Sequence, residues 1–398
     1  MPFSIQWPDC RWKSHPTSSR VAFPPGPGLT LYLPMLFLNI CHAWSNIALS
    51  TPELWSDIQV HCPVGENPGK LLERWFGRAV PRPLSLSLHG TAAEGMISLI
   101  DQHGHRLRNL ELFVPSGIDL LEITRSRSLP SLATLTIGQG ERNPPLYTGY
   151  ERYADDPSEC VAMLSAAPNL VECTLVNIHF DDEFEVAPSP SSLVTHSSLQ
   201  RLHIGRYPRP DMLDPASSAT IVCYLTLPSL QHLSISCLDT PFETFLAFLR
   251  RSSPPLTSLG LYVASLPERN LDAVAEQFLR LIPRVTNLDV MFDEEEFIFT
   301  HVLASSPRHL PNLRNLTLRE GFPAFSGSRY GQVLGVLSTR LAIPHSEFRS
   351  FRSFWDDNPQ IWQERELSVD VIAGMRALVA GGMDIHIGKE GHNLISVF

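Results

Sequence analysis

A short pattern of hydrophobic positions, apolar-x-x-apolar-x-apolar, recurs eight times between residues 107 and 318. The copies are Leu107-Leu110-Leu112, Leu132-Leu135-Ile137, Leu170-Cys173-Leu175, Leu199-Leu202-Ile204, Leu230-Leu233-Ile235, Leu256-Leu259-Leu261, Val285-Leu288-Val290 and Leu313-Leu316-Leu318. Successive copies begin 25 to 38 residues apart. Because alternate side chains of a strand point to the same face, the last two apolar positions of each copy predict a strand with one buried face.

The segments between these predicted strands carry apolar residues at helical spacing, as in Phe242–Leu249 and Leu271–Leu281. Several of them end at a proline just before the next strand, for example Pro254, Pro283 and Pro311. A proline cannot continue a helix and favours extended backbone at the residue before it. The interval is in or just above the range of roughly 20–29 residues that leucine-rich repeats show. The sequence therefore predicts an α/β leucine-rich-repeat solenoid, or horseshoe, in which stacked units share one core.

The chain divides into four predicted parts. Residues 1–30 are proline-rich and predicted to be irregular, and residues 31–80 form a helical segment in which Thr51 is the expected N-cap of a second short helix. Residues 81–320 form the solenoid, beginning with the alternating strand at 84–88. Residues 321–398 are the expected C-terminal capping region, because the end of a solenoid needs a different outer face.

Composition narrows the classes of function. The formal net charge is −10 and the basic residues are scattered, which argues against a nucleic-acid partner. The seven cysteines include no CxxC pair, which favours a reduced intracellular protein, cytoplasmic or nuclear, without disulfides or structural zinc. The apolar stretch at 29–40 is interrupted by Pro34 and is shorter than the about 20 residues that span a bilayer, so we expect a buried helix and no membrane partner.

Residues 41–58, CHAWSNIALSTPELWSDI, carry a resemblance to a known family. They resemble the second half of the F-box-like domain at the front of many fungal F-box/leucine-rich-repeat proteins. The matching positions are Cys41, Trp44, Ile47, Ala48, Leu49, Ser50, Thr51, Pro52, Leu54, Trp55 and Ile58. The similarity continues loosely through most of the chain after residue 30, and the 44–58 core is its specific part.

The resemblance implies a non-catalytic substrate-recognition adaptor of a Skp–cullin–F-box type ubiquitin ligase. The F-box helices would dock on the Skp-type subunit, and the repeats would hold a protein substrate. The residues implied for Skp docking or F-box packing are Leu36, Ile40, Trp44, Ile47, Ala48, Pro52, Leu54 and Trp55. No cofactor is implied.

The first half of the F-box departs from the family. Members usually open with a Leu-Pro-x-Glu-like turn, whereas this chain has only Leu33-Pro34-Met35-Leu36 with no acidic residue following. Either the first helix has diverged or the chain starts inside a longer domain. A protein-interaction scaffold with no link to a ubiquitin ligase is therefore the alternative.

The predicted partner-binding surface is the inner face of the strands. The residue between the last two apolar positions of each copy points away from the core, which gives a largely polar series. The candidate residues are Glu111, Thr136, Thr174, His203, Ser234, Asp289 and Thr317, with Arg201, Tyr262 and Arg319 as neighbours. Their mixed charge favours a protein or peptide over a phosphate ligand.

Catalytic chemistry has little support in the sequence. The acidic runs Asp181-Asp182-Glu183 and Asp293-Glu294-Glu295-Glu296 lack the ligand spacing of a calcium loop and are predicted to be solvated loops. Neither a GxSxG nucleophile motif nor a HExxH zinc motif occurs. A metal-dependent hydrolase is the remote alternative, and we expect no catalytic or metal-binding residue.

Overall fold

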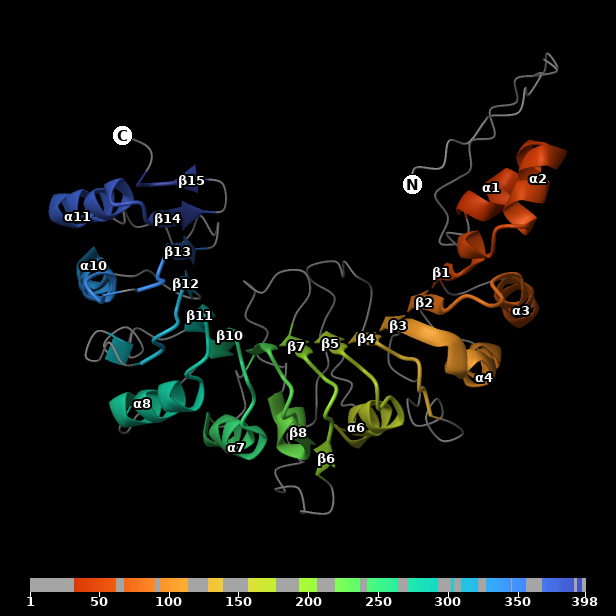
Figure 1. The fold of residues 1–398 in the computed structure, drawn as a ribbon, viewed down its shortest axis with the longest axis horizontal. Helices are drawn as coiled ribbons and strands as arrows, with labels where there is room; N and C mark the ends of the chain where they lie inside the picture. Colours follow the sequence, from red (N-terminus) through yellow and green to blue (C-terminus); the bar gives the residue numbers. More distant parts are fainter. Residues whose placement is uncertain are drawn as a thin grey trace, which may run out of the picture.

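The structure is a computed structural model. It describes residues 32–61, 68–89, 94–113, 128–138, 157–176, 193–205, 219–236, 242–263, 271–292, 302–303, 309–320, 327–344, 346–355, 367–389 and 392–395. The sequence-predicted lead at residues 1–30 and both acidic runs lie outside these residues. Figure 1 shows that most of the described strands form one curved sheet, with helices along its outer side.

The helices lie between successive strands of the large sheet or at its ends. The α-helices are α1 (Tyr32–Ile40), α2 (His42–Leu49), α3 (Pro68–Arg78), α4 (Glu94–His103), α6 (Pro157–Ala166), α7 (Phe242–Ser252), α8 (Leu271–Leu281), α10 (Gly327–Leu341) and α11 (Val369–Ala380). Shorter 3-10 helices are η1 (Pro52–Trp55), η2 (Gly104–Arg106) and η5 (Ala219–Tyr224). The predicted helix at 271–281 is confirmed at its exact bounds. None of the helices in the described part of the chain is long and apolar enough to cross a membrane.

The large sheet has 13 strands in the order β1-β2-β3-β4-β5-β7-β9-β10-β11-β12-β13-β14-β15. They are β1 (Asp57–His61), β2 (Leu84–His89), β3 (Leu107–Phe113), β4 (Thr134–Gly138), β5 (Glu172–Val176), β7 (Arg201–Gly205), β9 (His232–Ser236), β10 (Ser258–Val263), β11 (Asn287–Phe292), β12 (Asn315–Glu320), β13 (Ser350–Trp355), β14 (Asp384–Lys389) and β15 (His392–Asn393). All neighbours pair in parallel except β14 and β15. Strands β6 (Val194–Thr195) and β8 (Leu225–Thr226) form a separate parallel pair.

The residues of the repeated apolar pattern form the core between the sheet and the helices. In the copy that contains β5, Leu170, Cys173 and Leu175 are all buried, and the corresponding positions of the neighbouring strands pair with them in register. The first apolar residue lies in the turn before the strand, and the other two face the helices. Burial of these side chains between the sheet and the helices is the main favourable contribution to folding.

The structure contradicts the predicted fold class. The described residues form an α/β fold on one large, mostly parallel sheet, and not the predicted leucine-rich-repeat solenoid or horseshoe. The segments between strands are not copies of one unit: α7 and α8 have 11 residues each, whereas β6 lies in the connection before β7 and pairs with β8, which follows η5 in the connection before β9. What recurs is the buried turn and strand. Any parallel sheet needs a crossover of about a dozen residues or more between neighbouring strands, so a long interval alone does not define a repeat family.

The sheet also begins earlier than the sequence pattern indicated. Ile58 was expected in a helix but lies in β1, where it pairs with Leu86 of β2. Trp55, Ile58 and Val60 in fact repeat the apolar-x-x-apolar-x-apolar spacing, and all three are buried. The predicted N-cap Thr51 does precede η1, but its hydroxyl donates to the Ile47 carbonyl at 2.7 Å instead of capping the helix.

On the outer side, arginine side chains form hydrogen bonds between neighbouring inter-strand segments. The Arg251 guanidinium donates to the carbonyl oxygens of Val222, Cys223 and Leu225 at 2.7–3.2 Å. Arg106 donates in the same way to the carbonyls of Phe76 and Arg82. The Phe76, Val222 and Cys223 carbonyls lie in the last turns of α3 and η5, where a helix has no donor of its own for them, and the Leu225 carbonyl belongs to β8.

Candidate functional site

The inner face of the sheet carries a trough that crosses the strands from β5 to β14 and has a volume of about 640 Å³. We call it the sheet trough. Seven sequence-predicted residues line it: Thr174, Arg201, His203, Ser234, Tyr262, Asp289 and Thr317. Its other polar lining residues are Glu172, His232, Ser258, Asn287, Asn315, Ser350, Arg352 and Asp384.

The strand register brings these side chains together. In one row across the sheet, Glu172 pairs with Arg201, Arg201 with His232, and His232 with Ser258. Parallel strands lie about 4.8 Å apart, so residues paired in this way are direct neighbours on the face. The row continues through Asn287.

The charged side chains of the trough are arranged as ion pairs. Arg201 lies 3.3 Å from Glu172 at one end, and Arg352 lies 3.3 Å from Asp384 at the other. Between them, the Asp289 carboxylate accepts from the Arg319 Nε at 3.0 and 3.1 Å. The two outer pairs are exposed, so each contributes little to stability, about 0–1 kcal/mol. They nevertheless place a positive and a negative side chain next to each other at each end of the trough.

A network around Tyr262 covers the centre of the trough floor. The Tyr262 side chain is 9% exposed and interacts with Ser234 and Arg319. Burial, helped by the nearby Asp289 charge, raises the pKa of the Tyr262 hydroxyl to about 12. Burial also raises the pKa of Asp289, although Arg319 opposes the shift. Gly260 completes the arrangement, because a Cβ there would lie 3.2 Å from the Ser234 hydroxyl oxygen.

The Tyr262 shift predicts a loss of stability at alkaline pH. An unfolded tyrosine ionises near pH 10, whereas Tyr262 keeps its proton to about pH 12, so the folded state binds more protons in this window. The free energy of unfolding should therefore fall by up to about 1.4 kcal/mol per pH unit from this group alone as the pH rises through it. Denaturant unfolding at pH 9 and pH 11 should show a smaller decrease for Tyr262→Phe than for the wild type. Equal decreases would contradict this assignment.

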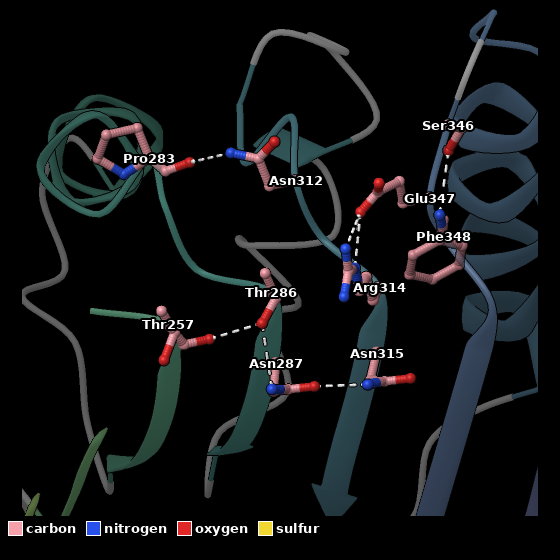
Figure 2. A network of polar contacts seen from close by, with 10 residues as sticks. All are labelled: Thr257, Pro283, Thr286, Asn287, Asn312, Arg314, Asn315, Ser346, Glu347 and Phe348. Carbon is pink, nitrogen blue, oxygen red and sulfur yellow. Dashed lines mark hydrogen bonds and ion pairs between the residues drawn. The ribbon is translucent and has the colours of Figure 1, made fainter. Parts of the chain in front are cut away.

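Polar side chains connect β10, β11 and β12 at the amino ends of these strands (Figure 2). The Thr286 hydroxyl donates to the Thr257 carbonyl at 3.0 Å, and the Asn287 amide donates to that hydroxyl at 3.2 Å. Asn315 then donates to the Asn287 side-chain oxygen at 2.5 Å. These bonds hold both asparagine side chains in fixed positions and connect β10, β11 and β12.

Four other polar side chains of the floor have hydrogen-bonding capacity left. Thr174, His232, Ser258 and Thr317 are half-buried, and among the described residues their side chains make no hydrogen bond or ion pair. A hydroxyl can donate one hydrogen bond and accept two, and a neutral imidazole can do one of each. The trough thus combines paired charges with available neutral groups.

Three sequence-predicted residues of this face lie outside the trough lining. Glu111 of β3 accepts from the Ser87 hydroxyl at 2.8 Å, and that hydroxyl is also 2.9 Å from His89 Nε2. Thr136 of β4 pairs in register with Glu111 and Thr174. Arg319 is not a lining residue either, but it acts there through Asp289.

The N-terminal helices present a second surface, which is apolar. Of the eight large hydrophobic side chains that are exposed in the described part of the chain, four lie on α1 and α2: Leu36, Ile40, Ile47 and Leu49. Their exposed fractions are 57%, 48%, 45% and 46%. We call these four residues the α1–α2 surface. Grouped exposed apolar residues mark interaction sites more often than single ones do.

The remaining residues of the predicted docking set pack inward. Ala48 and Trp55 are fully buried, and the Trp55 Nε1 donates to the Ala48 carbonyl at 2.7 Å. Trp44 stacks on Phe37 with ring centroids 5.2 Å apart. Pro52 is half-buried, and the partly buried Leu54 packs against the core.

The sequence analysis missed the last part of the trough, Ser350, Arg352 and Asp384. The copy of the pattern that contains β13 is Phe348-x-x-Phe351-x-Ser353, in which a serine takes the third apolar position. Ser353 is nevertheless buried, because its hydroxyl is 3.0 Å from that of Tyr330. A search that allowed one polar residue in the pattern would have found this strand.

Two observations bear on metal and thiol chemistry in the described part of the chain. Among the described residues, no group of three or more His, Cys, Asp or Glu side chains is placed to hold a metal ion. Cys173 is fully buried, and burial raises the pKa of its thiol to about 12, which makes it a poor nucleophile.

Comparison with protein-family models finds no match to this chain, and comparison with curated proteins finds no similar sequence.

Proposed function

We propose that this chain is a non-catalytic substrate-recognition adaptor of a Skp–cullin–F-box type ubiquitin ligase. The α1–α2 surface docks the Skp-type subunit, and the sheet trough receives a protein substrate. Neither step requires a cofactor or a catalytic residue.

The observation that supports this proposal most directly is the α1–α2 surface. Two of its four residues, Ile47 and Leu49, belong to the segment at 41–58 that resembles an F-box-like domain, and its exposed apolar side chains are available for a partner. Ala48 and Trp55 of the same segment are buried and join it to the end of the sheet near β1. The resemblance and the exposed surface thus point to the same docking partner.

The position of the trough supports the second part of the proposal. The trough is lined by residues of β5 to β14, whereas the α1–α2 surface belongs to helices beyond β1 at the other end of the sheet, so a partner at one leaves the other site open. Figure 1 shows α1 and α2 apart from these strands. An adaptor needs two such independent surfaces.

The docking step predicts that Ile40→Glu/Ile47→Glu binds a Skp-type subunit about a hundredfold more weakly than the wild type, because two apolar contacts are lost. Co-purification with a co-expressed Skp-type subunit, followed by calorimetry, measures this. Val369→Glu/Val379→Glu is the matched control, since both valines are exposed on α11. Circular dichroism confirms that each variant is folded.

Two results would count against the adaptor role. One is a wild-type protein that does not bind the subunit at all, and the other is an equal loss in the α11 control. If the subunit does not bind but trough substitutions abolish binding of a protein partner, the chain is an interaction scaffold outside the ubiquitin system.

A further inference from the structure

We infer that the sheet trough binds an extended, uncharged polar segment of its protein partner. This inference rests on the proposed function, because it takes a protein as the partner. It adds the conformation and the chemical class of the segment that enters the trough.

The first argument is the charge balance of the trough. Glu172, Asp289 and Asp384 each face an arginine, at 3.3, 3.0 and 3.3 Å respectively. A charged group of a ligand would attract one member of such a pair and repel the other, so its net electrostatic interaction with the pair is weak. From the described residues, an acidic, phosphorylated or strongly basic segment therefore meets no complementary net charge in the trough.

The second argument is the set of polar groups that remain available. The side chains of Thr174, His232, Ser258 and Thr317 make no hydrogen bond within the described residues, and all four are half-buried. A ligand that covers these half-buried donors and acceptors displaces their water. It must therefore form hydrogen bonds with them, because their desolvation otherwise costs free energy. Backbone amides and neutral polar side chains offer such bonds without disturbing the ion pairs.

The third argument is the length of the site. Thr174 lies on β5 and Thr317 on β12, which are separated by five inter-strand steps in the sheet order. At about 4.8 Å per step the distance is about 24 Å. An extended chain covers that distance with about seven residues. The segment thus runs across the strands along the trough floor.

The experiment measures binding of labelled peptide pools to the full chain at neutral pH. Each pool contains peptides of about nine residues with blocked ends, a length that covers the site. The neutral pool is built from Ser, Thr, Asn, Gln, Gly and Ala, and matched pools carry several Glu or several Lys residues. A neutral linear glucan of similar length is the fourth probe.

We expect the neutral pool to bind about tenfold or more tightly than either charged pool or the glucan, with less than about a twofold change between 0.05 M and 0.5 M NaCl. The variant Thr174→Ala/His232→Ala/Ser258→Ala/Thr317→Ala should weaken that binding by about tenfold or more, since it removes neutral hydrogen bonds and no charge. The matched variant Ser98→Ala/His105→Ala/Thr339→Ala changes exposed residues of the outer elements and should leave binding unchanged.

Tighter binding of a charged pool or of the glucan overturns the inference, as does the absence of binding by every pool. Equal loss in the two alanine variants overturns it as well, because binding would then not involve the trough. These results leave the test of the α1–α2 surface untouched, so failure of the inference and failure of the adaptor role are distinguished by different measurements.

Discussion

Replacing Trp55 with alanine should lower the free energy of unfolding by about 3–5 kcal/mol, the usual cost of truncating a fully buried aromatic side chain. Trp55 is 0% exposed and its ring meets the Trp75 ring edge-on at 4.8 Å. Arg78 lies over the same ring at 4.4 Å. The substitution also removes one donor to the Ala48 carbonyl, which then keeps the longer bond from the Thr51 amide at 3.3 Å.

Urea unfolding followed by circular dichroism measures this effect. Trp44→Ala is the control, because Trp44 is only half-buried, where it stacks on Phe37. Trp55→Phe should lower the free energy of unfolding less than Trp55→Ala does, because phenylalanine keeps most of the apolar volume and removes only the hydrogen bond. A loss for Trp55→Ala no larger than that for Trp44→Ala would show that the 41–58 segment is not part of the cooperative core.

The second large effect is expected at Arg251. Alanine at this position leaves three carbonyl oxygens, those of Val222, Cys223 and Leu225, without the donor that now serves them. We expect the free energy of unfolding to fall by about 2–4 kcal/mol, since each uncompensated acceptor costs roughly 1–3 kcal/mol and water reaches part of the site.

Denaturant unfolding again provides the measurement, with Arg250→Ala as the neighbouring exposed control. That control should change stability by no more than about 0.5 kcal/mol. Arg251→Lys should recover only part of the loss, because a single ammonium group does not reproduce the planar fork of the guanidinium. If Arg251→Ala and Arg250→Ala are equally stable, the carbonyl contacts contribute nothing to the fold.

The sequence predicted the strands well because their burial follows a local rule. In each copy of the pattern, such as Leu230-Leu233-Ile235, alternation alone tells which side chains face the core. The same rule identified most of the trough floor, for example His203 and Asp289, since the residues between the buried ones must face the other way.

The fold class and the limits of the trough could not be predicted in the same way. Whether connecting segments form identical units depends on their packing against one another, and η5 with the β6–β8 pair breaks that uniformity. The alternation at 383–387 predicts a final strand, which is β14, but β13 escaped notice because Ser353 takes a position that the pattern reserves for an apolar residue. The Tyr330 hydroxyl that compensates its burial lies 23 residues away in the chain. Pairing of Arg352 with Asp384 depends on the same register.

The order of the strands has a consequence for how the chain reaches its native state. In the large sheet, strand order follows chain order throughout, so every pairing joins segments separated by a single connection. The entropy lost on closing each connection is similar, since doubling a loop adds only about 0.6 kcal/mol. Low sequence separation between contacting residues is associated with rapid folding. Two adjacent strands anywhere in the sheet can therefore act as a nucleus, and growth can proceed toward both termini.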